Sequence, residues 1–308
     1  MSTELDLIAA IQAALGTPPP RVLVGSGDDA AVVRADGVAV TSIDTVVDGV
    51  HFSRSTHSPA DIGHKALATA LSDLAAMGAG PGEAYVSLAL PPDFEGALDL
   101  VAAMRSLAQE QGVAIAGGDV VSSPVLAVTV SVTGWSGAAD RLVYRSGAQA
   151  GDLVGVTGEL GGSGAGLAAL QRGVTEGPLV DRHRRPQPLL ATGLALAAAG
   201  VTAMIDVSDG VATDAAHLAR ASGVTLDLRL ADLPLAAGVE SAVDAATAGD
   251  DYELLFTAPP GLRAAVERVA AATGTRVSWL GDVGAGGAVA RLHAADGSVV
   301  DLSGYEHG

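Results

Sequence analysis

Short apolar runs that end at aspartates recur along the whole chain. Such runs are typical of short buried strands, so the pattern predicts a fold in which carboxylates gather at strand ends. The five clusters are Asp28 and Asp29 after residues 22–24, Asp44 after 38–43, Asp119 after 113–115, Asp206 and Asp209 after 203–205, and Asp250 and Asp251 after Gly249. A carboxylate beside a buried strand is costly unless a partner balances its charge. Together the clusters indicate oxygen ligands for hard cations, which usually serve phosphate chemistry.

Helix-like segments alternate with these runs in two successive blocks. Ser58 and Pro59 suit the start of a long helix to about Met77. The other elements expected in the first block are strands near 21–24, 30–34, 38–43, 84–90, 113–116 and 124–134, and helices at 4–15 and about 91–111. After a linker at 141–151, the second block predicts strands near 152–156, 202–206, 224–229, 253–257 and 277–281, and helices near 164–171, 188–199 and 209–221. We therefore expect two α/β domains of the α+β type, residues 1–140 and 141–308, with mixed sheets and packed helices.

The composition excludes several classes of protein. The formal net charge of −18 argues against a basic surface for nucleic acid. No apolar run approaches the ~20 residues of a membrane span, and residues 1–4 lack the pattern of a signal peptide. Because cysteine is absent, there is neither a disulfide framework nor a thiolate zinc site. We expect a cytoplasmic protein that binds neither membrane nor nucleic acid.

The most informative single residue is Asp73, which stands in a helical segment otherwise rich in Ala, Leu and Met. Aspartate has a low helix propensity, and an unpaired buried carboxylate is strongly unfavourable or takes up a proton. An exposed position on an amphipathic helix is the simpler explanation, but the apolar flanks favour a metal-paired role. Ser42 and Asp44 form a second candidate pair of oxygen ligands, and His51 follows seven residues after Asp44.

Other acidic clusters allow both structural and functional interpretations. Asp28-Asp29 and Gly118-Asp119 stand beside glycines, a combination that is also typical of tight turns. Ser208 or Asp209 would cap the helix that follows, which leaves Asp206 unexplained.

Two further features concern phosphate binding. The glycine-rich residues 158–167 lack the lysine of a phosphate loop, so close helix–strand packing is the favoured interpretation. Arg145 is then the best-placed cation for a phosphate group, and an exposed ion pair of little energetic value is the alternative.

Taken in order, nine motifs resemble the thiamine-monophosphate kinase family over nearly the whole chain. They are GDDAAV, SIDTVVDGVHF, KALATALSDLAAMGA, AGGDV, YRSGAQAGD, VTGELGGSGAGL, IDVSDG, AGDDYELLF and GYEH. That family belongs to a superfamily with aminoimidazole ribonucleotide synthetase, selenophosphate synthetase and the hydrogenase-maturation dehydratase. The resemblance implies their two-domain fold, ATP at the domain junction, and a homodimer in which strands of the first domain join the partner's in a barrel.

The resemblance also implies a reaction, the ATP-dependent phosphorylation of thiamine monophosphate to thiamine diphosphate. A substrate phosphate oxygen would attack the γ-phosphate in line, without a phosphoenzyme. Because the substrate phosphate is largely ionised near neutral pH, no catalytic general base is implied. Several Mg²⁺ ions would neutralise the phosphate groups that meet in the site.

Carried over position by position, the resemblance implies three groups of site residues. The magnesium ligands are Asp29, Ser42, Asp44, Asp73, Asp119, Asp206 and Asp209, with Asp28 in support. Asp214 is not carried over, because its place one turn into the helix after Asp209 favours a structural or supporting role. The nucleotide contacts are Gly118, Asp119, Arg145 and Ser208. The contacts to thiamine monophosphate are His51, Asp250 and Tyr305, since an aromatic ring and a carboxylate suit a cationic thiazolium and an aminopyrimidine.

Three positions depart from the family pattern. Ile43 stands where a hydroxyl residue is common, so only its backbone carbonyl could reach a metal. Asp250 replaces a glutamate and is shorter by one methylene. The four residues that end at Phe52 are GVHF, where the family has GNHF. His51 is kept, but its polar neighbour is missing.

Two alternatives remain open at this stage. Selenophosphate synthetases usually carry a reactive Cys or selenocysteine near the N-terminus, which this chain lacks, and the cyclo-ligase relatives generally lack the DYELLF and GYEH pair. A non-catalytic acidic metal-binding protein is the alternative from another class. It would need neither a site near the C-terminus nor strand-end aspartates paired with helix N-termini.

Overall fold

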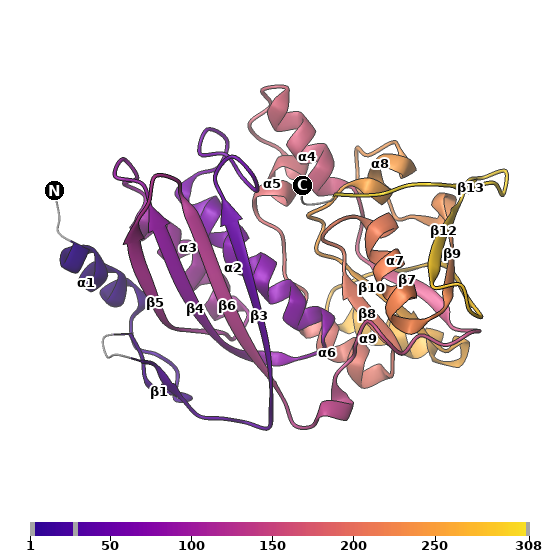
Figure 1. The fold of residues 1–308 in the computed structure, drawn as a ribbon, viewed down its shortest axis with the longest axis horizontal. Helices are drawn as coiled ribbons and strands as arrows, with labels where there is room; N and C mark the ends of the chain where they lie inside the picture. Colours follow the sequence, from indigo (N-terminus) through magenta and orange to yellow (C-terminus); the bar gives the residue numbers. More distant parts are fainter. Residues whose placement is uncertain (1–3, 27–29, 306–308) are drawn as a thin grey trace. The chain divides into compact units, whose positions relative to one another are not determined.

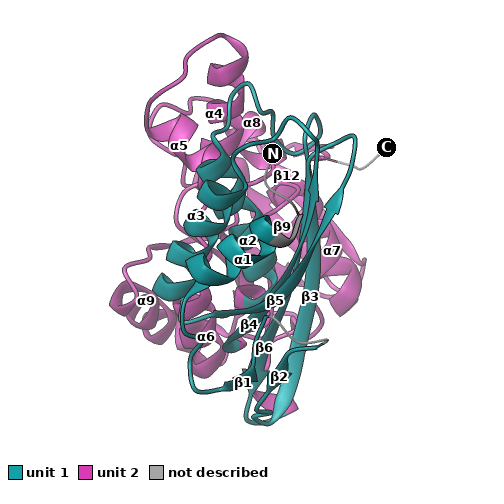
Figure 2. Cartoon of the chain, turned by 90° about the vertical axis from the view of Figure 1, so that its left-hand side faces the viewer, with its two compact units in different colours: residues 1–74, 80–138 teal, residues 75–79, 139–308 magenta. Residues whose placement is uncertain are grey.

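The computed structural model describes residues 4–26 and 30–305, and the chain divides into two compact units. The first unit contains residues 1–74 and 80–138, and the second contains residues 75–79 and 139–308 (Figure 2). The sequence placed residues 75–79 with the first block. They group with the second because the Ala75 carbonyl lies against Gly193, 2.1 Å from where a Cβ on that glycine would stand.

The first unit consists of three helices and two sheets among the described residues (Figure 1). In chain order its elements are α1 (Glu4–Leu15), β1 (Val22–Val24), β2 (Val32–Val33), β3 (Val38–Val47), α2 (Pro59–Ala76), β4 (Gly80–Leu90), α3 (Ala97–Glu110), β5 (Ala114–Ser122) and β6 (Ala127–Ser136). Strands β1 and β2 form a small antiparallel pair. The main sheet has the strand order β3-β6-β4-β5, in which only β4 and β5 run parallel.

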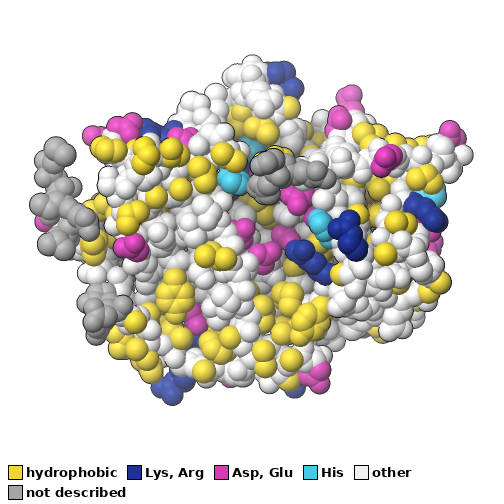
Figure 3. Space-filling model, viewed as in Figure 1, with side chains coloured by type: hydrophobic (Ala, Val, Ile, Leu, Met, Phe, Trp, Pro, Cys, Tyr) yellow, Lys and Arg dark blue, Asp and Glu magenta, His cyan; other side chains and the backbone are white. Residues whose placement is uncertain are grey.

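One face of the four-stranded sheet is covered by α2 and α3, and no helix among the described residues of the unit covers the other (Figures 1 and 2). The two-residue periodicity of a strand explains which side chains lie on each face. Val128, Val130 and Val132 of β6 are fully buried, whereas Thr129 and Ser131 between them lie on the uncovered face. Figure 3 shows hydrophobic side chains scattered among other side chains over this uncovered face.

Strands β3 and β5 extend further than the sequence predicted. Asp44 lies inside β3, not at its end, because β6 pairs with β3 over its whole length. Gly118 and Asp119 likewise lie inside β5 and do not form a turn. The glycine is required for strand pairing, since a Cβ on Gly118 would lie 2.2 Å from the Val86 carbonyl oxygen.

The second unit is built on a seven-stranded sheet. Its strands are β7 (Leu153–Thr157), β8 (Ala203–Asp206), β9 (Thr225–Arg229), β10 (Leu254–Ala258), β11 (Val277–Gly284), β12 (Val289–His293) and β13 (Val299–Val300). The strand order is β13-β12-β9-β11-β7-β10-β8, and only β9 and β12 pair in parallel. Its helices are α4 (Gly162–Gln171), α5 (Pro178–Arg184), α6 (Leu190–Ala199), α7 (Val211–Ser222), α8 (Ala242–Thr247) and α9 (Arg263–Ala272), with 3-10 turns at Ala139–Arg141, Leu230–Asp232 and Pro260–Leu262.

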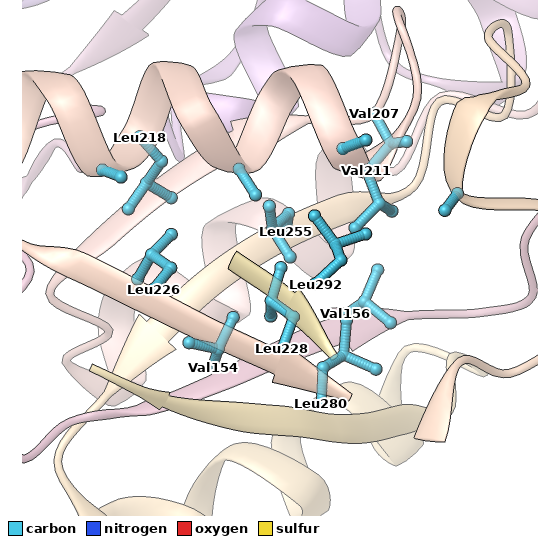
Figure 4. Packing of buried hydrophobic residues seen from close by; sticks show 14 of the residues in the cluster. Val154, Val156, Val207, Val211, Leu218, Leu226, Leu228, Leu255, Leu280 and Leu292 are labelled. Carbon is cyan, nitrogen blue, oxygen red and sulfur yellow. The ribbon is translucent and has the colours of Figure 1, made fainter. Parts of the chain in front are cut away.

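The main core of the second unit lies between α7 and the sheet (Figure 4). Val211 and Leu218 lie on the buried side of α7, and they face Leu226 and Leu255 of the strands below. Burial of each such side chain contributes roughly 1.5–3 kcal/mol. This packing fixes the β8–α7 connection, which carries Ser208 and Asp209.

The predicted fold class, α/β with mixed sheets and packed helices, is confirmed. Helices α5, α8 and α9 and strands β12 and β13 were not expected from the sequence. Over the residues that the structure describes, no helix combines the length and apolar character that crossing a membrane requires.

Candidate active site

Ser42, Asp44 and Asp73 come together in the first unit. Ser42 and Asp44 pair with Val132 and Val130 of β6, so their side chains lie on the helix-covered face of the sheet. There the Ser42 hydroxyl donates a hydrogen bond to the Asp73 carboxylate of α2. Three of the predicted metal ligands are therefore neighbours, although they come from a strand and a helix.

The Asp44 and Asp73 carboxyl groups lie within hydrogen-bond reach of each other. Burial, the charge of Asp73 and the hydrogen bond to Asp73 together raise the pKa of Asp44 to about 6. Two carboxylates this close repel each other unless a proton or a cation lies between them. Their hard oxygen atoms, with that of Ser42, suit Mg²⁺.

Ile43 lies on the opposite face of β3. It pairs with Ser131 and is 67% exposed. Because neighbouring strand residues point to opposite faces, any side chain at this position would point away from Asp73. The isoleucine thus removes no side-chain ligand from the Ser42–Asp44–Asp73 group.

Asp119 is not part of that group within the unit. It lies on β5, at the opposite edge of the sheet from β3, and pairs with Ser87 on the uncovered face. With Gly118, Tyr85 and Ser131 it lines an open concavity of about 570 Å³ on that face. The other predicted ligand of this unit, Asp29, lies outside the described residues, as does Asp28.

His51 follows β3 in a tight turn. Its backbone N–H donates to the Val47 carbonyl, and its Nδ1 accepts the Val47 N–H at 3.1 Å. A ring nitrogen that accepts a backbone N–H carries no proton, so the neutral imidazole holds its proton on Nε2.

In the second unit, three carboxylates lie around the β8–α7 connection. Asp206 ends β8 and is buried, and the Asp209 N–H donates to the buried carboxylate of Asp214 at 3.1 Å. Burial and the charges of Asp206 and Asp209 raise the pKa of Asp214 to about 8. The prediction that Ser208 or Asp209 caps α7 was wrong, since the cap position is Gly210 and no side chain bonds there.

Arg145 is close enough to this group for its charge to lower the pKa of Asp214. Its own backbone carbonyl accepts a hydrogen bond from the Ser222 hydroxyl of α7. The backbone of Arg145 is thus tied to the C-terminal end of α7, whose first turn follows Asp209. Within the described residues of either unit, however, no three His, Asp or Glu side chains are close enough together to hold a metal ion.

Asp250 and Tyr305, 55 residues apart in the sequence, meet at the same connection. The Asp250 N–H donates to the Ser208 carbonyl at 2.8 Å, and the Tyr305 N–H donates to the Asp209 carbonyl at 3.0 Å. Gly304 allows this approach, since a Cβ there would lie 1.8 Å from the Asp209 carbonyl oxygen. Four predicted site residues are therefore joined by backbone hydrogen bonds.

Sequence reasoning missed the role of Asp251. Its carboxylate accepts the Gly161 N–H at 2.6 Å and the Ser163 N–H at 3.2 Å, at the start of α4. A side chain of the protein thus occupies the position that a phosphate would take in a phosphate loop. The interpretation of residues 158–167 as a packing element agrees with these contacts.

Glu253 was also missed. It lies over the same turn, accepts the Thr157 hydroxyl at 2.7 Å, and leaves no room for a side chain on Gly158. Burial raises the pKa of Glu253 to about 7. Neither the glycine-rich turn nor the two acids give a signal in the sequence that these groups contact each other across about 90 residues.

Comparison with known proteins identifies the relatives of this chain. Residues 27–136 match the N-terminal domain model of AIR synthase related proteins, and residues 149–293 match the C-terminal one. A thiamine-monophosphate kinase of Mycobacterium tuberculosis is 43% identical over 235 residues, which are 75% of this chain and 69% of the relative. The crystal structure of thiamine-monophosphate kinase from Stenotrophomonas maltophilia is 32% identical over 96% of both chains, with a TM-score of 0.84.

A further solved structure contains ligands. It is AaThiL complexed with AMPPCP and TMP, which is 29% identical to this chain over 98% of both chains, with a TM-score of 0.77.

Proposed function

Since this chain belongs to the thiamine-monophosphate kinase family, within the AIR synthase related proteins, we propose that it transfers the γ-phosphate of ATP to thiamine monophosphate. The products are thiamine diphosphate and ADP. The observation that carries the proposal is the likeness, over 98% of both chains, to a structure that holds AMPPCP and TMP together. The contacts that join Ser208, Asp209, Asp250 and Tyr305 support it.

The reaction is a direct in-line transfer. A phosphate oxygen of thiamine monophosphate attacks the γ-phosphorus, the bond to the β-phosphate oxygen of ATP breaks, and ADP leaves with that electron pair. Because the attacking oxygen is already ionised, the protein has to position the groups and balance their charge, and no general base is needed.

Two sets of carboxylates, one in each unit, would hold Mg²⁺. In the first unit the ligands are Ser42, Asp44 and Asp73. A divalent cation there relieves the repulsion between the two carboxylates. In the second they are Asp206 and Asp209, with Asp214 behind them. When bound, Mg²⁺ neutralises phosphate oxygens and favours attack at the γ-phosphorus. Asp119, with Gly118 beside it, and Asp29 are proposed as further ligands.

Arg145 and Ser208 are proposed to contact the nucleotide, and Arg145 to balance charge on the transferred phosphoryl group. His51, Asp250 and Tyr305 are proposed to bind thiamine monophosphate. For His51, the donor of the ring is the Nε2–H, since Nδ1 accepts a backbone N–H.

We also propose a homodimer formed through the uncovered face of the four-stranded sheet. Ile43 and Val121 are exposed on that face, at 67% and 44%, which supports its pairing with a second copy. A cytoplasmic location stays a prediction from the sequence.

The test is an assay of purified protein with ATP, Mg²⁺ and thiamine monophosphate, followed by separation of thiamine diphosphate and ADP. Formation of both products in equal amounts supports the proposal. ATP consumption only with formylglycinamidine ribonucleotide would instead identify a cyclo-ligase, and a complete lack of nucleotide binding would favour an acidic metal-binding protein.

A further inference from the structure

The turn that carries Asp250 is strained. Asp250 has φ of 64° and Tyr252 has φ of 52°, so two non-glycine residues adopt the left-handed region within three positions. Such conformations cost free energy and persist only where surrounding contacts fix them. The structure shows which contacts those are.

The backbone of the turn is fixed to the β8–α7 connection. Asp250 N–H donates to the Ser208 carbonyl, and Tyr252 N–H donates to the Val207 carbonyl, both at 2.8 Å. The Val207 N–H donates in return to the Glu253 carbonyl at 2.7 Å. The strained residues therefore sit directly beside the segment that carries Ser208.

The side chain of Asp251 holds the turn from the other side. It lies between the two strained residues in sequence, and its carboxylate binds the first N–H groups of α4 through Gly161 and Ser163. Two backbone N–H groups and the positive end of a helix stabilise the ionised carboxylate. This bond links the turn to a helix that starts 88 to 90 residues earlier.

The side chain of Tyr252 acts on Asp250 itself. The ring is buried, and the hydroxyl donates to Asp250 Oδ1 at 2.9 Å. A bond from a rigid buried phenol fixes the rotamer of the carboxylate and the direction of its second oxygen.

We propose that Asp251 and Tyr252 are positioning residues for thiamine monophosphate. Asp251 holds the strained turn in place, and Tyr252 directs the Asp250 carboxylate toward the cationic organic part of the substrate. This inference rests on the proposed function, because it assumes that Asp250 contacts that substrate. Both residues act through Asp250, so the effect is on substrate binding.

Tyr252→Phe and Asp251→Asn test the proposal. The first removes only the hydroxyl, and the second keeps the size of the side chain but loses its charge. Loss of a hydrogen bond to a charged group is expected to raise the KM for thiamine monophosphate about tenfold in each variant. The KM for ATP should stay within about twofold of the wild-type value. Titration calorimetry with thiamine monophosphate alone should show the same weakening without turnover.

Two matched variants serve as controls. Asp152→Asn neutralises a buried carboxylate of the same unit that accepts the Gln149 N–H and the Thr202 hydroxyl, at the other end of β7. Tyr144→Phe removes a tyrosine hydroxyl that donates to the Ala139 carbonyl. Both should keep the wild-type KM for thiamine monophosphate, even where Asp152→Asn lowers the melting temperature.

The outcomes separate the two proposals. If wild-type protein forms no thiamine diphosphate, the proposed function fails. If it does, and Tyr252→Phe leaves the KM and the calorimetric affinity for thiamine monophosphate unchanged, the positioning role is overturned. An equal rise of both KM values would also overturn it, since that is the result of a general structural defect. Should Asp251→Asn fail to fold, Tyr252→Phe alone decides.

Discussion

Asp250 and Tyr305 are attached to two consecutive carbonyl groups, those of Ser208 and Asp209. The attachment is through the backbone N–H groups, with N–O distances of 2.8 and 3.0 Å, and uses neither side chain. A carboxylate and an aromatic ring are thereby held next to the start of α7. A carboxylate and an aromatic ring are groups that suit a cationic heteroaromatic substrate.

Tyr305→Ala should raise the KM for thiamine monophosphate more than the KM for ATP. The aromatic face is lost, while the Tyr305 N–H that donates to Asp209 remains. We expect a rise of about fivefold to about thirtyfold, the range for one stacking or cation–π contact. Steady-state kinetics with each substrate varied in turn measures this. Tyr305→Phe is the control, because it keeps the ring, and an unchanged KM in Tyr305→Ala would remove the residue from the site.

Asp44→Asn and Asp73→Asn should fold normally but lose most activity. Each removes one charge from a pair that repels in the free protein, so neither variant should melt below wild type without Mg²⁺. Wild-type protein should gain stability on addition of Mg²⁺, by about 2.7 kcal/mol at a concentration of 100 times the Kd. Thermal melts with and without Mg²⁺ should show that this gain is much smaller in both variants.

An exposed carboxylate of the same unit provides the control for those melts. Asp93 forms an ion pair with Arg54 on the surface, at an N–O distance of 2.7 Å. Asp93→Asn should keep the stabilisation by Mg²⁺. If Asp44→Asn and Asp73→Asn keep it as well, these residues do not bind the ion.

The Ser42–Asp44–Asp73 group could be predicted from the sequence for a physical reason. An aspartate within an Ala-, Leu- and Met-rich helix needs a partner, and a strand with a hydroxyl and a carboxylate two residues apart presents both on one face. The same periodicity places Ile43 on the other face. The sequence showed the substitution, but only the register with Ser131 shows that the side chain at this position points away from Asp73.

The location of Asp119 and the contacts of Asp251 could not be predicted in the same way. Glycine next to aspartate is the usual composition of a turn, but tight pairing with β4 makes Gly118 and Asp119 part of a strand. The bond from Asp251 to Gly161 spans 90 residues, and no local pattern specifies it. Local propensity describes single elements, whereas these positions depend on which elements become neighbours.

Asp119→Asn should lose most activity with little change in melting temperature. The side chain is exposed on the uncovered sheet face, so the fold does not depend on its charge. Activity should fall by about a hundredfold or more if the carboxylate binds a metal ion that carries phosphate. The measurements are kcat at saturating substrates and a thermal melt. Turnover equal to wild type would exclude Asp119 from the site.

Glu253→Gln should make stability less dependent on pH. Burial raises the pKa of Glu253 from 4.5 to about 7, so the folded state binds a proton between these values that the unfolded state has released. Protonation therefore favours folding, and stability falls as the pH rises from about 4.5 to about 7, by at most roughly 3 kcal/mol for this group. Gln keeps an oxygen for the Thr157 hydroxyl but cannot ionise. Urea unfolding at about pH 5 and about pH 8 should show a smaller difference in the free energy of unfolding for the variant than for wild type.

Because Asp251 also has a raised pKa, the stability of the Glu253→Gln variant will keep some pH dependence. An equal difference in both proteins would show that Glu253 has an ordinary pKa in the folded state.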